Sequence, residues 1–231
     1  MEATLFNGQR VSYPIRFRRA TQAVAFMNVR HAEVRSLLPR DVKVYDAGYG
    51  MAEMYLAWIQ APDTDLGSLD EVQIGFLVED PFYRMPCTFL YANPISSEFA
   101  RASGVDLWSL HKLTSRIEIQ RGGGRARCAV SVDGLELVCI EGPEPQGSGQ
   151  DYNSLMCVGQ RSPSIVFRYL QRASSWATVE RPDDVTVTTG DHPLGQLISR
   201  LRCEPGIRRY SFREHCDFLI GPPLNRLLSG D

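Results

Sequence analysis

The chain has 231 residues, of which 43% are hydrophobic and 23% are charged, and its formal net charge is −2 at pH 7. A nucleic-acid-binding surface needs a basic stripe, and a membrane-spanning helix needs about 20 consecutive apolar residues. The sequence has neither, and its first residues lack the basic and apolar regions of a signal peptide. We therefore expect a cytoplasmic protein with no nucleic-acid or membrane partner.

The length and the pattern of the chain also favour one folding unit. A chain of this size can bury roughly 70% of its unfolded surface, and no repeat, linker or low-complexity tract divides it. Its six cysteines form no Cys-x-x-Cys pair, and the only adjacent ligand pair is His215-Cys216, whose side chains would face opposite ways on a strand. We expect a single domain over residues 1–231, with reduced cysteines and no metal site.

The first part of the chain predicts strands with one short helix. Residues 1–21 are polar and rich in arginine, which indicates an arm or an edge strand. A short helix is expected at 31–38, where Pro39 ends it. Apolar runs and alternation with period two are typical of strands, and we expect them at 22–29, 42–45, 51–60, 71–79 and 86–91.

The second part begins with a predicted helix. Asn93-Pro94 matches a helix cap followed by proline at the first helical position, and Gly104 matches a helix end. Asp133-Gly134 predicts a tight hairpin turn, and residues 142–149 predict a loop. Short helices are expected at 193–201 and 222–228, and strands at 115–120, 125–132, 135–140, 165–170, 184–189, 207–213 and 216–220.

Many short strands with hairpin signals and few helices define the expected fold class. The pattern predicts an α+β fold that is mainly β, an antiparallel β-barrel or sandwich with a few short helices. The helices are too few and too scattered for alternating βαβ units, so a doubly wound nucleotide-binding fold is not expected.

Lys112 is the most informative single residue. The chain has only two lysines, Lys43 and Lys112, among its 25 basic residues. Leu107, Trp108 and Leu110 surround Lys112 with apolar side chains, so its ammonium group is expected to be partly desolvated. A neutral amine attacks carbonyl groups, which an arginine cannot do. Lys112 is therefore either a Schiff-base nucleophile or a lysine whose stem packs on Trp108 while its head reaches water.

The segment around Lys112 resembles the acetoacetate decarboxylase family. Members of that family carry a helix and then Gly-Arg-Glu, three varied positions, an aromatic or apolar residue and Pro-Lys-Lys-Leu. Gly104 matches the glycine, Asp106 the acidic residue, and Lys112 the first lysine of the pair, which forms the Schiff base. The resemblance implies that family's β-barrel or sandwich fold.

Three further segments extend this resemblance over most of the chain. The family has a glycine a few residues before a catalytic glutamate that opens a strand, and Gly67 and Glu71 match these two positions. A short helix that ends in Leu-Pro matches Leu38-Pro39. The segment Asp191-His192-Pro193-Leu194 is also similar.

The sequence departs from the family pattern at several positions. Leu113 stands where the family has its second lysine, His111 replaces the proline, and Val105 replaces the arginine after the glycine. A second acidic residue of the family falls near Leu56 and is lost. The family arginine near the first strand maps onto Arg19 or Arg18.

The resemblance implies covalent catalysis by Lys112, which would attack a ketone and form an iminium. Glu71 would then orient the substrate or carry protons, with a solvent-facing strand end as its alternative. Arg19 would bind a substrate carboxylate through its two-pronged guanidinium, or it is a surface arginine. His111 could act as an acid or base near neutral pH, or simply pack or reach solvent.

Three other residues are candidates for the wall of the binding site. Arg116 and Glu118 share one face of an expected strand, so they either line a polar cavity or face water. Trp108 is expected in the core or in the wall of the pocket.

Two enzyme activities and one binding function fit these residues. The first is decarboxylation of a β-keto acid through a Lys112 iminium. The second is aldolase-dehydratase or cyclase chemistry on a keto acid or a polyketide-like substrate, which the loss of the second lysine favours. The third is a barrel that binds an apolar small molecule without covalent chemistry. The resemblance implies no metal or organic cofactor, and it implies a homo-oligomer.

Overall fold

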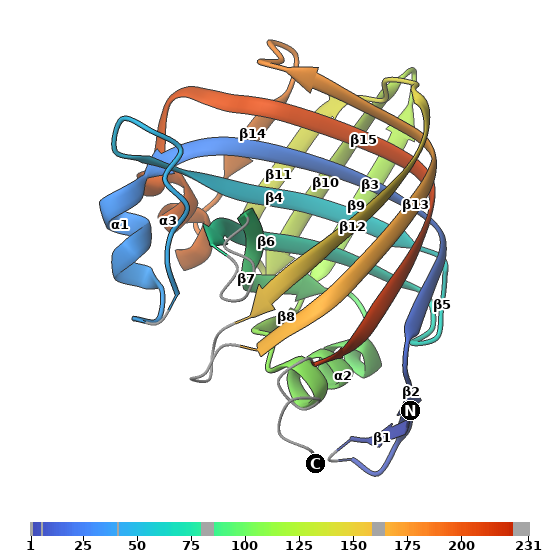
Figure 1. Ribbon diagram of the computed structural model, residues 1–231. Helices are drawn as coiled ribbons and strands as arrows, with labels where there is room; N and C mark the ends of the chain where they lie inside the picture. The colour runs from blue at the N-terminus through green and yellow to red at the C-terminus, as the bar shows by residue number, and fades with distance from the viewer. Residues whose placement is uncertain (1, 6, 41, 80–85, 159–164, 224–231) are drawn as a thin grey trace.

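The computed structural model describes residues 2–5, 7–40, 42–79, 86–158 and 165–223 (Figure 1). Within them the chain forms three short helices, α1 (His31–Leu37), α2 (Glu98–Trp108) and α3 (Pro193–Leu201). The strands are β1 (Glu2–Thr4), β2 (Arg10–Ser12), β3 (Ile15–Arg30), β4 (Met51–Ala61), β5 (Asp63–Thr64), β6 (Leu69–Glu79), β7 (Pro86–Ile95), β8 (Lys112–Thr114), β9 (Arg116–Gly122), β10 (Arg125–Val132), β11 (Leu135–Pro143), β12 (Ser148–Val158), β13 (Ile165–Glu180), β14 (Thr186–Thr189) and β15 (Arg202–Pro223).

These strands form one large sheet and two smaller ones. The nine-stranded sheet has the order β12-β13-β15-β3-β4-β6-β7-β8, with β5 paired to β3. Most neighbours in it are antiparallel, but β8 runs parallel to β7. Strand β12 also pairs with β7, so the sheet curls back toward itself. A four-stranded sheet has the order β14-β11-β10-β9, and β1 pairs with β2. The fold is mainly β, as the sequence predicts.

The main hydrophobic core lies between the nine-stranded and the four-stranded sheets. Strand side chains alternate between two faces, and one face of β3, β4 and β6 contributes fully buried residues such as Met27, Trp58 and Phe76. The facing residues of β10 and β11 include Cys128 and Ile140, and α1 and α3 close the same core at its edge (Figure 1). This core fixes which residues of β3, β4 and β6 point the other way.

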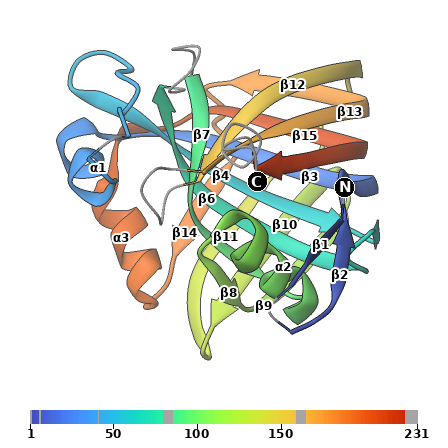
Figure 2. The same cartoon turned by 60° about the horizontal axis from the view of Figure 1, so that its bottom comes forward.

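The opposite face of the nine-stranded sheet lines the inside of its curl. A second apolar cluster fills one end of this space, and α2 covers that end (Figure 2). Phe17 of β3, Ile59 of β4, Phe218 of β15 and Trp108 of α2 belong to the cluster, and all four are buried. The candidate active site lies in this cluster.

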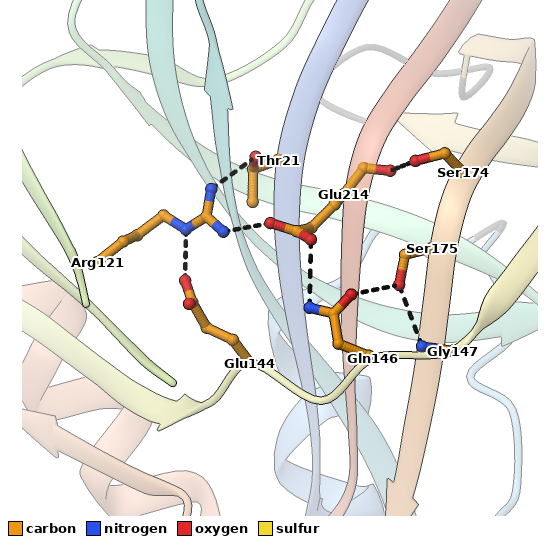
Figure 3. A network of polar contacts seen from close by, with 8 residues as sticks. All are labelled: Thr21, Arg121, Glu144, Gln146, Gly147, Ser174, Ser175 and Glu214. Carbon is orange, nitrogen blue, oxygen red and sulfur yellow. Dashed lines mark hydrogen bonds and ion pairs between the residues drawn. The ribbon is translucent and has the colours of Figure 1, made fainter. Parts of the chain in front are cut away.

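A polar junction ties the four-stranded sheet to the nine-stranded sheet (Figure 3). Arg121 of β9 forms ion pairs with Glu144 and with Glu214 of β15, and it also donates to the Thr21 hydroxyl at 3.3 Å. Gln146 donates to the other carboxylate oxygen of Glu214 at 3.3 Å. The junction fixes the end of β9 against β3 and β15.

Several predicted elements are confirmed, some with extended bounds. Helices α1 and α3 lie where the sequence places them, and the Asp133-Gly134 turn joins β10 to β11 with both residues at positive φ, as a type I′ turn requires. Within the described residues, no helix is both long and apolar enough to cross a membrane.

Other predictions about the first strands and the second helix are wrong. From Ile15 onward the arginine-rich segment is neither an arm nor an edge strand but the start of the central strand β3, whereas β1 and β2 before it pair with each other as a separate two-stranded sheet. Asn93-Pro94 does not begin a helix but continues β7, and Ser97 caps α2 instead. Gly104 lies inside α2, which continues to Trp108.

Further corrections concern the loops and the last strands. Residues 42–45 form only an isolated bridge at Val44. The predicted loop at 142–149 is partly strand, since β11 extends to Pro143 and β12 begins at Ser148. The two predicted strands at 207–213 and 216–220 are one strand, β15, bent at its irregularities. The predicted helix at 222–228 lies mostly outside the described residues.

Candidate active site

Lys112 and Glu71 form a buried ion pair inside the curl of the large sheet. Lys112 Nζ lies 3.0 Å from Glu71 Oε2, and their side chains are only 7% and 6% exposed. Lys112 opens β8, and Glu71 lies near the start of β6. The two residues are 41 positions apart in the chain, and the structure brings them together.

The end of α2 determines how Lys112 enters this space. The helix ends at Ser109, whose left-handed backbone lets its N–H donate to the carbonyls of Gly104 and Val105. The chain then turns, and Lys112 pairs with Asn93 of β7 in parallel register. Gly104 faces the Lys112 stem directly, because a β-carbon at residue 104 would overlap Cε and Cδ of Lys112. Glycine at position 104 therefore makes room for the lysine.

Glu71 is held by hydrogen bonds to both of its carboxylate oxygens. Oε2 accepts from Lys112, and Oε1 accepts from Asn93 Nδ2 at 2.9 Å and from Gln73 Nε2 at 3.3 Å. Asn93 is fully buried and Gln73 is 6% exposed. These three donors fix the position of the Glu71 carboxylate.

A small, mainly apolar cavity of about 40 Å³ adjoins the ion pair. Glu71, Gln73 and Lys112 are its polar side chains among the described residues, and one face of α2 contributes Ala100, Gly104 and Trp108 at four-residue spacing. The other described residues of its wall are Phe17, Ile59, Leu66, Leu69, Leu90, Ile95, Leu110, Phe218 and Ile220. An amine and a carboxylate in such surroundings can exchange a proton away from bulk water.

Trp108 lies in the cavity wall, in the place that the sequence suggests. It is 3% exposed, its indole N–H donates to the carbonyl of Gly221 at 3.2 Å, and its ring meets Tyr13 edge to face at 5.8 Å. These contacts fix the indole ring in the wall next to α2.

His111 and Arg19 lie outside the described wall of this cavity. His111 is partly exposed, and its backbone carbonyl accepts from the Asn93 N–H at 2.8 Å. Arg19 is exposed and has a positive φ of 53° at an irregularity of β3, where its N–H donates to Asp217. Arg18 forms ion pairs with Asp63 and Asp65 instead. None of these three side chains lines the described wall of the cavity at Lys112.

Arg116 and Glu118 lie on β9 in the four-stranded sheet. Their side chains are 79% and 46% exposed, and they form an ion pair with each other at 2.5 Å. Both belong to a shallow surface depression, and neither lines the cavity at Lys112. The sequence left open whether this strand face lines a polar cavity or faces water. In the structure it faces water.

Sequence reasoning missed two polar residues of the site. Gln73 shares a strand face with Glu71 through period-two alternation, so that pattern could have indicated it. Asn93 resembled a helix cap because Pro94 follows it, and only the parallel pairing of β7 with β8 places it beside Lys112. Among the described residues, no three His, Cys, Asp or Glu side chains gather as a metal site would require.

The fold and the site together define a class: a mainly β protein whose curled sheet holds a buried lysine–carboxylate pair beside an apolar cavity. The family model of acetoacetate decarboxylase (ADC) matches residues 5–198. The chain therefore belongs to the acetoacetate decarboxylase family. No curated protein sequence matches it significantly.

Solved structures of this family share the fold at low sequence identity. An acetoacetate decarboxylase from Legionella pneumophila is 11% identical and has a TM-score of 0.65, with 92% of this chain and 86% of that chain covered. An acetoacetate decarboxylase-like enzyme from Sphingomonas wittichii RW1 is 14% identical, with a TM-score of 0.63 and coverages of 96% and 98%. The enduracididine biosynthesis enzyme MppR, complexed with the condensation product of pyruvate and imidazole 4-carboxaldehyde, is 16% identical, with a TM-score of 0.60 and coverages of 90% and 88%.

Proposed function

We propose that this protein is a Schiff-base-forming lyase that decarboxylates a small β-keto acid through Lys112. The observation that carries the proposal is the Lys112–Glu71 pair, with an N–O distance of 3.0 Å, in a buried and mainly apolar cavity. Lys43 is unsuited to this role, because its side chain is 66% exposed and pairs with Glu79.

In the proposed reaction Glu71 takes a proton from the Lys112 ammonium group, and the neutral amine attacks the ketone carbon. The carbonyl oxygen leaves as water, which gives a protonated imine. The bond from the α-carbon to the carboxylate then breaks, and its electron pair moves into the iminium to form an enamine. Carbon dioxide leaves, the enamine carbon takes a proton, and water hydrolyses the imine to the product ketone and free Lys112.

The apolar wall favours the bond-breaking step. A substrate carboxylate is charged before this step and leaves as neutral carbon dioxide, while the iminium becomes a neutral enamine. Poorly solvating surroundings destabilise the charged groups more than the neutral products. Side chains such as Ile59, Leu90 and Phe218 supply those surroundings.

A second candidate is carbon–carbon bond formation, with subsequent dehydration or cyclisation, through an enamine on the same lysine. The observation that favours it is the residue after Lys112. Leu113 stands where the acetoacetate decarboxylase family has its second lysine, and it packs against the main hydrophobic core. The likeness in fold to MppR, whose solved structure holds the condensation product of pyruvate and imidazole 4-carboxaldehyde, supports the same candidate.

Reductive trapping tests the covalent step and separates the two activities. The protein is incubated with acetoacetate or pyruvate plus borohydride, and its intact mass and peptide map are measured. We expect an adduct on Lys112 that is absent from Lys112→Arg and unchanged in the matched control Lys43→Arg. With acetoacetate, an adduct that has lost the carboxylate, together with released carbon dioxide, supports decarboxylation.

The other outcomes assign the function differently. A trapped adduct that keeps its carboxylate, together with a new product from pyruvate and imidazole 4-carboxaldehyde, favours condensation. Absence of any Lys112 adduct with either ketone would contradict the proposal and leave non-covalent binding of an apolar molecule.

A further inference from the structure

A chain of hydrogen bonds continues from Glu71 away from Lys112. Gln73 Nε2 donates to Glu71 Oε1 at 3.3 Å, and the Tyr55 hydroxyl donates to Gln73 Oε1 at 3.1 Å. Gln22 Nε2 donates to the Tyr55 oxygen at 3.4 Å, and Arg213 Nη1 donates to Gln22 Oε1 at 2.9 Å. All five residues are at most 8% exposed. The chain therefore runs through the interior rather than along the surface.

Strand register explains why these side chains meet. Gln22 of β3 lies opposite Arg213 of β15 on one side and opposite Ile59 of β4 on the other. Ile59 and Tyr55 share one face of β4 because they lie four positions apart, and Glu71 lies opposite Ile59 on β6. All these side chains thus point into the curl of the sheet, as the cavity residues do.

The groups at the two ends of this chain of hydrogen bonds fix the direction in which each bond is donated. Arg213 can only donate, so Gln22 must turn its oxygen to Arg213 and its amide NH₂ to Tyr55. The Tyr55 hydroxyl accepts from Gln22 and donates to Gln73, whose NH₂ is then left for Glu71. The Glu71 carboxylate accepts this last hydrogen bond. The series of bonds therefore begins at a donor, Arg213, and ends at an acceptor.

Gln171 anchors the Arg213 end. Arg213 Nη1 also donates to Gln171 Oε1 at 2.7 Å, and Gln171 Nε2 donates to Gln22 Oε1 at 3.1 Å. The guanidinium of Arg213 stacks on the ring of Trp176, with its carbon 3.6 Å from the ring centroid. The cation that sets the direction of the chain is therefore held in place.

We propose that Tyr55 and Gln73 are positioning residues that present Glu71 to Lys112. The hydrogen bonds that begin at Arg213 fix the orientation of the Gln73 amide, so that its NH₂ group donates to Glu71 Oε1. Glu71 Oε2 is then the oxygen that exchanges a proton with Lys112. The catalytic part of this inference rests on the proposed Schiff-base function, but the ordering of Glu71 does not.

Removal of the Tyr55 hydroxyl breaks the chain in its middle. Gln73 loses the donor that fixes its oxygen, so its amide can rotate and withdraw the NH₂ group from Glu71. The Glu71 carboxylate is then held by the donors of Asn93 and Lys112. The variant Tyr55→Phe keeps the ring and its edge-to-face contact with Phe26, whose centroid is 5.6 Å away.

The experiment follows the carboxyl group of Glu71 directly. The carboxyl ¹³C signal of Glu71, assigned with Glu71→Gln, is recorded at one pH in the protein without substrate, since the shift of a carboxyl carbon depends on its hydrogen bonds. In Tyr55→Phe we expect this signal to shift, because Glu71 Oε1 loses one of its two amide donors. We also expect reductive trapping on Lys112 to fall about tenfold, the effect of one hydrogen bond to a charged group. The matched control is Tyr91→Phe, since Tyr91 makes the same edge-to-face contact with Phe76 at 5.6 Å.

A second variant separates positioning from folding. Gln22→Glu keeps an acceptor for Arg213, so we expect thermal stability to be retained. It removes the NH₂ donor and takes the Tyr55 proton, so the chain reverses and Gln73 turns its oxygen toward Glu71. We expect the Glu71 signal to shift further than in Tyr55→Phe, and borohydride trapping on Lys112 to fall further as well.

The outcomes distinguish this inference from the proposed function. A Glu71 signal with the same chemical shift in wild type, Tyr55→Phe and Gln22→Glu would overturn the positioning role. A wild-type protein that traps no ketone, but whose Glu71 signal moves in both variants, would overturn the Schiff-base function and retain the ordering of Glu71.

Discussion

Gly104 of α2 lies against the aliphatic stem of Lys112, so closely that a β-carbon would overlap two of its carbons. Residue 104 is buried in the helix, where glycine is less favourable than alanine by about 1 kcal/mol. The close approach of the lysine accounts for this glycine. It also explains how a long side chain can pass beneath α2 and reach Glu71.

Gly104→Ala is expected to displace Lys112 without unfolding the protein. The new methyl group pushes the stem aside and separates Nζ from Glu71, whereas alanine itself favours the helix. We expect reductive trapping on Lys112 to fall about 100-fold, as a displacement near 1 Å can cause, with little change in melting temperature. Gly122→Ala is the control, because a β-carbon there meets nothing within 4 Å. Equal trapping in both variants would contradict the steric role of Gly104.

Glu71→Gln is expected to lower the free energy of unfolding by about 3–5 kcal/mol, since it leaves the buried Lys112 ammonium without its counter-charge. Urea unfolding measures this loss. Lys112→Met should also destabilise the protein, because it leaves the Glu71 carboxylate unpaired. We expect the double variant to lose much less than the sum of the two single losses. Additive losses would show that the two charges do not stabilise each other.

Glu214 at the Arg121 junction is expected to make stability pH-dependent. Partial burial opposes its ionisation, but hydrogen bonds from Arg121 and Gln146 outweigh it and hold the pKa of Glu214 below its ordinary value. A depressed pKa stabilises the folded state above the unfolded-state value of about 4.3, and this contribution disappears as the pH falls through the folded-state pKa. Glu214→Gln should thus cost stability at pH 6 in urea unfolding, and the cost should shrink at pH 3. A constant cost would contradict this assignment.

The cysteines are expected to differ in their reactivity toward a thiol reagent. Burial raises the pKa of Cys216 to about 11, against a hydrogen bond from Gln171, and burial also raises the pKa of Cys128. At pH 8 a thiol with a pKa near 11 is ionised to only about one part in a thousand. Cys203 is partly exposed. Peptide mapping of the native protein should show Cys203 modified well before Cys128 and Cys216, and the reverse order would contradict their burial.

Local sequence signals predicted the elements that depend on local interactions. Asp133-Gly134 can adopt the positive φ values of its turn, and the spacing of apolar residues identified β4 and β6. Lys112 was found because a lysine among apolar neighbours, in a chain with two lysines, is unusual, whereas Glu71 was found only through the resemblance to the family. The resemblance to the family then connected two segments that no local pattern could join.

The remaining features depend on contacts that are distant in sequence. The polar start of β3 pairs with β15 and β5 in the large sheet, and Asp63, Asp65 and Asp217 bind its arginines and backbone. The backbone irregularity at Arg19 turns that residue outward, and no composition rule indicates it. Asn93 had a strong local helix signal, but tertiary pairing with β8 overrode it.

The face of α2 that borders the cavity carries an alanine, a glycine and a tryptophan, Ala100, Gly104 and Trp108, one turn apart. The sizes of these three side chains limit the size of the molecule that fits beside the Lys112 ammonium group. Position 104 must remain glycine because the Lys112 stem lies against it. Ala100 and Trp108 can be replaced by larger or smaller residues, because β6 and β8 hold the ion pair in place. Substitutions at these two positions of α2 would thus widen or narrow the cavity and leave the Lys112–Glu71 ion pair intact.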